Sequence, residues 1–293
     1  MAQPRWTYRP GPPSLEGLTR RRGDGLVRLL HIDGRPVVVA VSGLMFAARA
    51  DTEELARAGI ARMRFSLGVD DDLSEFYARF RDDPLIGRAV RARPWLRPRR
   101  NPTPWETLMW SITEQLIEMR RAVGIQRRLV RRFGRSFAGL WDSPSPEAIA
   151  ASAPAELEAC GLAGKRALAL RRAAREVAAG RVTFADTADV ARLLAIREIG
   201  TWTVEMVALH GLGRHDVLPA GDLGYLKLVG RLTTGNPKAV ADEAEVRGFF
   251  APYAPWSGLA AQHLLRSTSP TTRQAPPRAR TRWSAAALPK AAA

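Results

Sequence analysis

Residues 193–227 read LLAIREIGTWTVEMVALHGLGRHDVLPAGDLGYLK, and this stretch decides the fold. Two apolar helical runs flank a short turn at Gly200, and a second turn rich in Gly and Pro leads to Asp222 at the start of another helix. Glycine adopts positive φ at little cost, so Gly200 is predicted to reverse the chain, and Thr201 is predicted to cap the following helix. The first amides of that helix have no partner within it and, with the helix dipole, favour an anion.

The composition favours a polyanion as the partner of this site. Lys and Arg number 45 against 29 Asp and Glu, which gives a formal net charge of +16. Basic chains bind nucleic acids with sequence-independent affinity because they release counterions from the phosphates. Charge alone does not separate DNA from RNA or an anionic membrane, and biased codon composition is an alternative source of the abundant Arg.

The stretch resembles the helix–hairpin–helix, Gly/Pro-rich loop and Asp signature of the HhH-GPD superfamily of DNA base-excision glycosylases. Within it, the similarity is greatest to the bacterial 3-methyladenine DNA glycosylase II family. Ile199-Gly200-x-Trp202-Thr203 corresponds to the hairpin, and Gly213-x-x-Asp216-Val217-x-Pro219 corresponds to the loop. The similarity covers most of residues 95–265. It departs at Arg197-Glu198, where the family usually has Gly, often after Pro, and a Glu that faces a phosphate would repel it.

The expected fold class is α+β, with a small antiparallel-sheet domain followed by an all-helical HhH-GPD glycosylase domain. The sequence itself predicts the sheet, because β-type runs at 26–32 and 36–41 are joined by Asp33-Gly34, a strong hairpin signal. Apolar residues recur at helical spacing after residue 104. The other elements expected near the N-terminus are a short helix at 14–22, helices at 52–58 and 73–80, and a strand at 61–67.

Composition divides the chain into four predicted segments. They are a flexible N-terminus at 1–13, the α+β domain at 14–93, the helical glycosylase domain at 94–266, and a disordered basic tail at 267–293. The helical domain begins with the linker PWLRPRRNPTP, in which little regular structure persists. At the end of this linker, Thr103 and Pro104 suit the N-cap and the first turn of a helix.

The resemblance assigns the catalytic acid. Removal of a damaged base breaks a C1′–N bond through a sugar with oxocarbenium character, and one carboxylate can stabilise that charge and activate water. Asp222 lies where the family has its catalytic acid. Asp216 is the nearby rival, and an Asp in a loop often only bonds backbone groups. The residues alone do not rank the two, whereas the family pattern makes Asp216 structural.

The resemblance also assigns the DNA contacts. Leu116 corresponds to an apolar wedge that fills the place of a flipped base, although its helical spacing equally fits an ordinary core residue. The residues expected at the DNA are Gln115, Leu116, Ile199, Gly200, Thr201, Trp202 and Thr203. The family further implies a monovalent cation held by hairpin carbonyls.

The expected base pocket consists of Trp202, Met206 and Leu265. An indole face attracts a cationic alkylated purine, whereas the alternative is that Trp202 covers the core of its helix pair. Bifunctional relatives have a Schiff-base Lys two positions after the hairpin Gly, and here that position is Trp202. The chain is therefore similar to the monofunctional branch.

No cofactor is expected. The single cysteine, Cys160, excludes a four-cysteine iron–sulfur cluster and an internal disulfide, and it favours a reducing compartment, the cytoplasm and its nucleoid. The four histidines lack zinc spacing, and Asp70-Asp71-Asp72 is typical of an acidic helix start rather than a metal site. No run approaches the roughly 20 apolar residues of a membrane span, and no secretory signal is visible.

The predicted function is a monomeric, monofunctional DNA glycosylase that flips and excises alkylated bases of the 3-methyladenine type from double-stranded DNA. Two alternatives stay open. One is a glycosylase for deaminated purines, since nothing in the sequence excludes that substrate. The other is a non-catalytic helix–hairpin–helix DNA-binding protein, which the presence of Asp222 disfavours.

Overall fold

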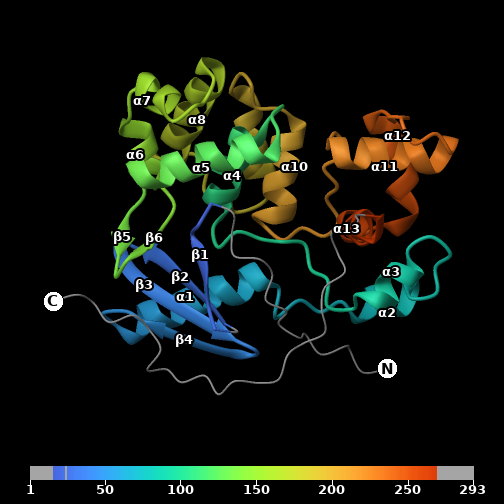
Figure 1. The fold of residues 1–293 in the computed structure, drawn as a ribbon, viewed down its shortest axis with the longest axis horizontal. Coiled ribbons are helices and arrows are strands. Elements are labelled where there is room, and N and C mark those ends of the chain that lie inside the picture. Colours follow the sequence, from blue (N-terminus) through green and yellow to red (C-terminus); the bar gives the residue numbers. More distant parts are fainter. Residues whose placement is uncertain (1–15, 24, 269–293) are drawn as a thin grey trace.

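The computed structural model describes residues 16–23 and 25–268, and within them a four-stranded antiparallel sheet precedes a series of helices (Figure 1). The predicted α+β class is confirmed. The predicted flexible segment at 1–13 and nearly all of the predicted tail at 267–293 lie outside the described residues.

The sheet is built around the predicted hairpin. Asp33 and Gly34 both have positive φ, 51° and 78°, as a tight two-residue turn requires, and Ile32 pairs with Arg35 across it. The predicted helix at 14–22 is wrong, because its second half pairs with the hairpin as an edge strand and gains ladder hydrogen bonds. The strands, in their order across the sheet, are β1 (Thr19–Arg22), β2 (Gly25–Ile32), β3 (Arg35–Ser42) and β4 (Met45–Arg49).

Helix α1 (Glu53–Leu67) covers one face of the sheet (Figure 1). The predicted strand at 61–67 is wrong, because those residues continue the helix that was expected only at 52–58. Leu55, Gly59 and Met63 recur every four residues and are buried against the sheet. A Cβ on Gly59 would lie 2.5 Å from Val37 Cγ1, so glycine permits the close approach.

The linker and the helices after it agree with the sequence. Thr103 caps α4 with its side chain, Pro104 is the first helical residue, and Gly134 ends α5. The small hairpin of β5 (Ser136–Phe137) and β6 (Leu140–Trp141) was not predicted. The helices are α4 (Pro104–Glu114), α5 (Met119–Phe133), α6 (Pro146–Ala151), α7 (Pro154–Ala159), α8 (Gly164–Ala178), α9 (Thr187–Ala191), α10 (Thr201–His210), α11 (Leu223–Thr234), α12 (Glu243–Phe250) and α13 (Ser257–Thr268), with 3-10 turns at Arg192–Ala195 and Ala251–Tyr253.

The helices form two hydrophobic cores. The first lies among α4, α5, α8 and α10. The second joins α11, α12 and α13 to α2 (Ser74–Phe80) and α3 (Gly87–Ala92), at the right of Figure 1. The predicted domain boundary at residue 93 therefore does not coincide with a break in packing, since α2 and α3 bury their apolar faces against the C-terminal helices. The loop at 211–222 carries the chain from the first core to the second.

A buried ionic group joins the sheet to the first helical core. The side chain of Arg28, on β2, is buried and donates to Glu106 Oε2 at 2.5 Å; it also lies 3.5 Å from Asp142 Oδ1. Asp142 Oδ2 accepts from the His31 amide at 2.8 Å. Burial raises the pKa of Glu106, and the charge of Arg28 opposes that rise.

Candidate active site

The hairpin ends at the N-terminus of α10, and Gly200 is its N-cap with φ −106° and ψ −179°. The predictions for this turn are wrong in two details. Gly200 does not have positive φ; Glu198 does, with φ 75°. Thr201 is the first helical residue rather than the cap, and no side chain caps the helix.

The N-terminus of α10 is bare. A Cβ on Gly200 would meet no atom within 4 Å, and its φ is ordinary, so neither packing nor backbone geometry requires glycine there. The amides of Gly200, Thr201 and Trp202 have no hydrogen-bond acceptor within the part of the chain that the structure describes. The first turn of α10 also contains no acid. Open space in front of free amides is the arrangement that an anion needs.

Glu198 occupies the left-handed backbone region that favours glycine. Such a conformation costs a non-glycine residue about 1–2 kcal/mol. The Glu198 carboxylate lies 3.6 Å from Arg197 Nε, and the side chain is half-buried. Water screens such a partly exposed pair, so the acid that departs from the family pattern keeps its negative charge near the turn.

The turn between α4 and α5 presents Leu116. Its side chain is fully exposed and its φ is 52°. Leu116 is therefore not a core residue, which removes the alternative that its helical spacing allowed. Met119, at the start of α5, is also exposed. The turn therefore presents two apolar side chains to solvent.

Gln115 joins this turn to the hairpin. Its Nε2 donates to the Glu198 carbonyl oxygen and to Thr203 Oγ1, each at 3.0 Å. Ile199 and Thr203 are buried as whole residues, and their amides donate to the Ile196 and Gly200 carbonyl oxygens, so neither residue presents a free donor at the surface. Thr201 and Leu116 are exposed, and Trp202 is half-buried.

Asp222 is the N-cap of α11. Its Oδ1 accepts from the Gly224 amide at 2.8 Å, which fixes the carboxylate at the helix end, where the dipole favours an anion. Its Oδ2 has no partner among residues 16–23 and 25–268. One oxygen is thus held by the helix while the other is available to a reactant.

Asp216, the rival acid, is fully engaged. Arg214 Nε and Nη2 donate to its two oxygens at 3.0 and 2.8 Å. The hydrogen bond from Arg214 lowers the pKa of Asp216. An acid held on both oxygens by a guanidinium shapes the loop, in agreement with the family pattern.

The same loop is fastened to the N-terminal part of the chain. His215 Nε2 lies 3.5 Å from Asp71 Oδ2, and Arg100 donates to the same oxygen. A Cβ on Gly213 would lie 2.6 Å from Arg100 Nη1. Burial opposes the charge of Asp71, but the hydrogen bonds from His215 and Arg100 outweigh it and hold the pKa of Asp71 at about 2. Asp71 is therefore an ion-pair centre rather than a simple acid at a helix start.

Leu265 lies beside Asp222. A Cβ on Gly224 would lie 2.9 Å from Asp222 Oδ1 and 3.6 Å from Leu265 Cδ1, so the end of α13 borders the acid. Trp202 and Met206 are four residues apart on α10, and both are half-buried. Neither belongs to the two hydrophobic cores of the described chain, which disfavours a core role for Trp202.

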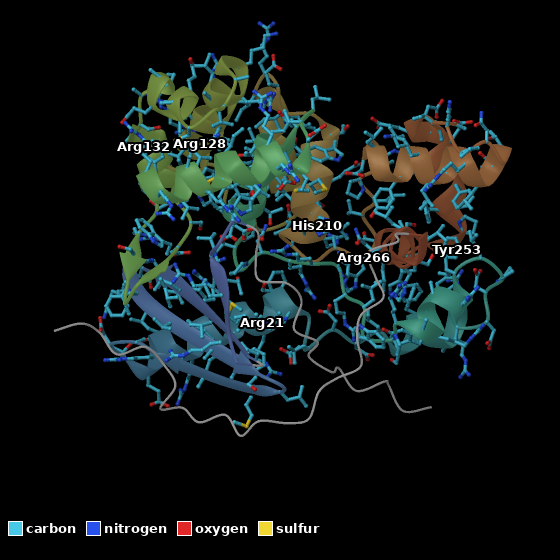
Figure 2. All side chains as sticks on the ribbon, in the orientation of Figure 1. Arg21, Arg128, Arg132, His210, Tyr253 and Arg266 are labelled. Carbon is cyan, nitrogen blue, oxygen red and sulfur yellow. The ribbon has the colours of Figure 1, made fainter. Side chains whose placement is uncertain are left out.

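Sequence reasoning missed two groups near Asp222. The charges of Glu114 and His210 interact with it, and burial raises the pKa of Glu114 and lowers the pKa of His210. His210 Nδ1 lies 2.6 Å from the Arg99 carbonyl, and Figure 2 labels it near Arg266 of α13. The one sequence signal for Glu114 is that it directly precedes Gln115, a predicted DNA contact. No local sequence pattern marks His210.

The described residues contain no group of three or more His, Cys, Asp or Glu side chains able to hold a metal ion. No helix in the same ranges is both long and apolar enough to cross a membrane.

Residues 109–249 match the family described as HhH-GPD superfamily base excision DNA repair protein. A DNA-3-methyladenine glycosylase of Bacillus subtilis is 28% identical over 210 residues, which are 68% of each chain. The 3-methyladenine DNA-glycosylase from Archaeoglobus fulgidus has a similar structure, with TM-score 0.73, 23% identity, and coverage of 86% of this chain and 90% of that one. The Clostridium acetobutylicum 8-oxoguanine glycosylase/lyase in complex with double-stranded DNA gives TM-score 0.66 at 16% identity, covering 87% and 88%. The two structural matches establish a common fold.

Proposed function

Because the chain belongs, through residues 109–249, to the HhH-GPD superfamily of base excision DNA repair proteins and is a DNA glycosylase, we propose that it is a monofunctional one that hydrolyses the N-glycosidic bond of flipped, alkylated bases. The observation that carries this proposal is the state of Asp222, with one oxygen held by α11 and the other free. This arrangement orients the carboxylate of Asp222 and leaves one of its oxygens able to interact with the substrate.

The mechanism begins with binding. The bare N-terminus of α10 receives one phosphate of the DNA backbone, and the basic surface supplies further phosphate contacts. The exposed Leu116 enters the stack in place of the flipped base and offsets part of the unstacking free energy. The flipped base then lies between the α10 side chains Trp202 and Met206 and the end of α13 at Leu265.

The chemical step needs one carboxylate. As the C1′–N bond breaks, the bonding electron pair leaves with the base, and the free oxygen of Asp222 stabilises the positive sugar. Water adds at C1′ and gives up a proton, which Asp222 accepts. A cationic alkylated purine departs as a neutral molecule, so this route needs no acid to protonate the leaving group.

The substrate class follows from Trp202. Its indole is half-buried and belongs to neither core, which supports a role in stacking against a base. Contact between an indole face and a cationic base contributes roughly 0.5–2 kcal/mol. That contribution favours 3-methyladenine-type bases over neutral damaged bases. Trp202 also replaces the Schiff-base Lys, so the strand stays intact.

A panel of duplexes, each with one lesion, tests the proposal. Alkylated purines, deaminated purines and 8-oxoguanine are incubated with the protein, and abasic sites are scored with and without alkaline strand cleavage. Release of 3-methyladenine, an unbroken strand before alkali and no borohydride-trapped adduct are expected. A trapped adduct contradicts the monofunctional assignment, preferential release of a deaminated purine contradicts the substrate class, and binding without any release indicates a non-catalytic DNA-binding protein.

A further inference from the structure

Two turns that are distant in sequence are linked by one side chain. The first is the wedge turn, residues 115–118, between α4 and α5; the second is the hairpin, residues 196–200, before α10. We propose that Gln115 is a positioning residue that holds the wedge turn and the hairpin at a fixed spacing, so that wedge insertion and phosphate binding occur together. The consequence for excision rests on the proposed function, whereas the linkage itself does not.

The contacts of Gln115 use its full capacity as a donor. The amide nitrogen has two N–H groups, and its two acceptors are the Glu198 carbonyl oxygen and Thr203 Oγ1, both at 3.0 Å. Thr203 is only 1% exposed, and its own amide donates to the Gly200 carbonyl at 3.1 Å. The two bonds therefore span the bare N-terminus of α10, from the turn before it to the first helical turn.

Both linked turns contain a strained residue. Leu116, directly after Gln115, has φ 52°, and Glu198, whose carbonyl Gln115 binds, has φ 75°. Non-glycine residues keep such conformations when the surrounding contacts fix them. The Gln115 side chain restrains both strained residues. Its contacts are therefore more than an incidental surface interaction.

The competing role for Gln115 is direct contact with DNA, which its position in the family motif suggests. With both N–H groups occupied, only the carbonyl oxygen of the side chain is available for such a contact. A residue that binds DNA acts independently of Thr203, whereas a residue that positions the hairpin acts through Thr203. The two roles therefore predict different double-mutant behaviour.

The experiment combines Gln115→Met, Thr203→Val and the double variant with two readouts. The first is hydrogen exchange of the Ile199, Thr203 and Val204 amides, which are hydrogen-bonded in the free protein, and it involves no DNA. The second is the single-turnover excision rate on a duplex with one 3-methyladenine. Gln115→Met keeps the side-chain length and Thr203→Val keeps the shape, and thermal unfolding verifies that each variant is folded. Gln115→Ala serves as the second variant at that position.

Exchange in the hairpin is expected to rise about 10-fold in Gln115→Met, the size expected for two lost neutral hydrogen bonds. Excision is expected to slow about 10-fold in Gln115→Met and about 3-fold in Thr203→Val, and the double variant is expected to equal Gln115→Met. Leu116→Ala is the control: it slows excision and leaves hairpin exchange unchanged.

Unchanged hairpin exchange in the Gln115 variants, or multiplying losses in the double variant, overturns the proposal and supports direct DNA contact. Absence of excision by the wild-type protein contradicts the proposed function alone, because the exchange experiment still decides whether Gln115 holds the hairpin.

Discussion

Helices α10 and α11 begin 22 residues apart in the chain, and their N-termini are built in opposite ways. The N-cap of α10 is Gly200, with open space where a side chain would be and free amides behind it. The N-cap of α11 is Asp222, whose carboxylate already accepts from the helix. The same local field is therefore open to an external anion at one end and holds an internal carboxylate at the other.

The two ends are also fastened differently. Neutral hydrogen bonds from Gln115 hold the turn before α10, whereas charged groups around Asp71 and Arg214–Asp216 hold the loop before α11. The contacts of Gln115 with the turn before α10 are thus neutral, whereas the contacts that hold the loop before α11 depend on ionised groups. Four experiments test this contrast.

Removal of the internal anion has the largest expected effect. Asp222→Asn is expected to reduce base release by more than about 100-fold, because it removes the carboxylate that stabilises the sugar and accepts the proton of water. Asn caps helices about as well as Asp, so folding and DNA binding stay nearly unchanged. Single-turnover excision and duplex titration measure the two quantities. Near-normal excision would assign the acid elsewhere, and Asp216→Asn is the matched control.

The pH dependence of protein stability tests the ionic contacts of Asp71. A pKa lowered from 3.8 to about 2 means that Asp71 contributes about 2 kcal/mol to stability at pH 7. Because the folded-state pKa is the lower one, this contribution is complete above pH 3.8 and is lost as the pH falls through about 2. Asp71→Asn is thus expected to destabilise the protein by about 2 kcal/mol at pH 7, and by progressively less in acid. Urea unfolding of both proteins from pH 7 to pH 2 measures the difference, and a pH-independent gap contradicts the assignment.

Gly200→Asp gives α10 the same N-cap residue that α11 has in Asp222. The ordinary φ and the open space accommodate the side chain, and the new cap is expected to stabilise the fold by a few tenths of a kcal/mol. The carboxylate occupies the phosphate position, so affinity for an abasic-analogue duplex is expected to fall about 10-fold. Gly200→Ala, without the charge, is the control. Equal affinity of Gly200→Asp and Gly200→Ala would mean that no phosphate binds there.

Glu198→Gly has the smallest expected effect. It relieves the left-handed strain and removes an acid from the hairpin, while the backbone carbonyl that Gln115 binds remains. Binding is expected to tighten by a factor of a few, under about 1.4 kcal/mol, and the gain is expected to shrink as salt rises. Glu198→Gln, which keeps the strain and removes the charge, separates the two causes. Weaker binding by Glu198→Gly would show that the acid supports the turn.

The sequence predicted features whose signal is local. Asp33-Gly34, the Thr103 cap and Pro104 all depend on neighbouring residues, and the structure contains each of them. The strand predicted at 61–67 failed because a short apolar window fits either period, and the burial of Leu55, Gly59 and Met63 against the sheet shows that the helical period applies.

The candidate site was less accessible to sequence reasoning. Family resemblance proposed Asp222 and Leu116, and the conformational freedom of glycine suggested a positive φ at Gly200, whereas the structure has it at Glu198. His210 and Gln115 act through partners that are distant in the sequence, Arg99 and Thr203, and no spacing reveals such pairs. The exposure of Leu116 was also not predictable from the sequence, because Leu116 has the helical spacing of a core residue although its side chain is fully exposed.

The Arg28–Glu106 pair limits how the sheet and the helices can be separated during evolution. Both residues lie outside the family match at 109–249, yet the pair is buried between the sheet and α4. A gene fusion that kept the helices and replaced the sheet would leave Glu106 with no counter-charge, at a loss of about 3–5 kcal/mol. A lineage that discarded the sheet would therefore have to exchange Glu106 for an apolar residue, and a shortened homologue that retained this acid without an arginine opposite it would contradict that expectation.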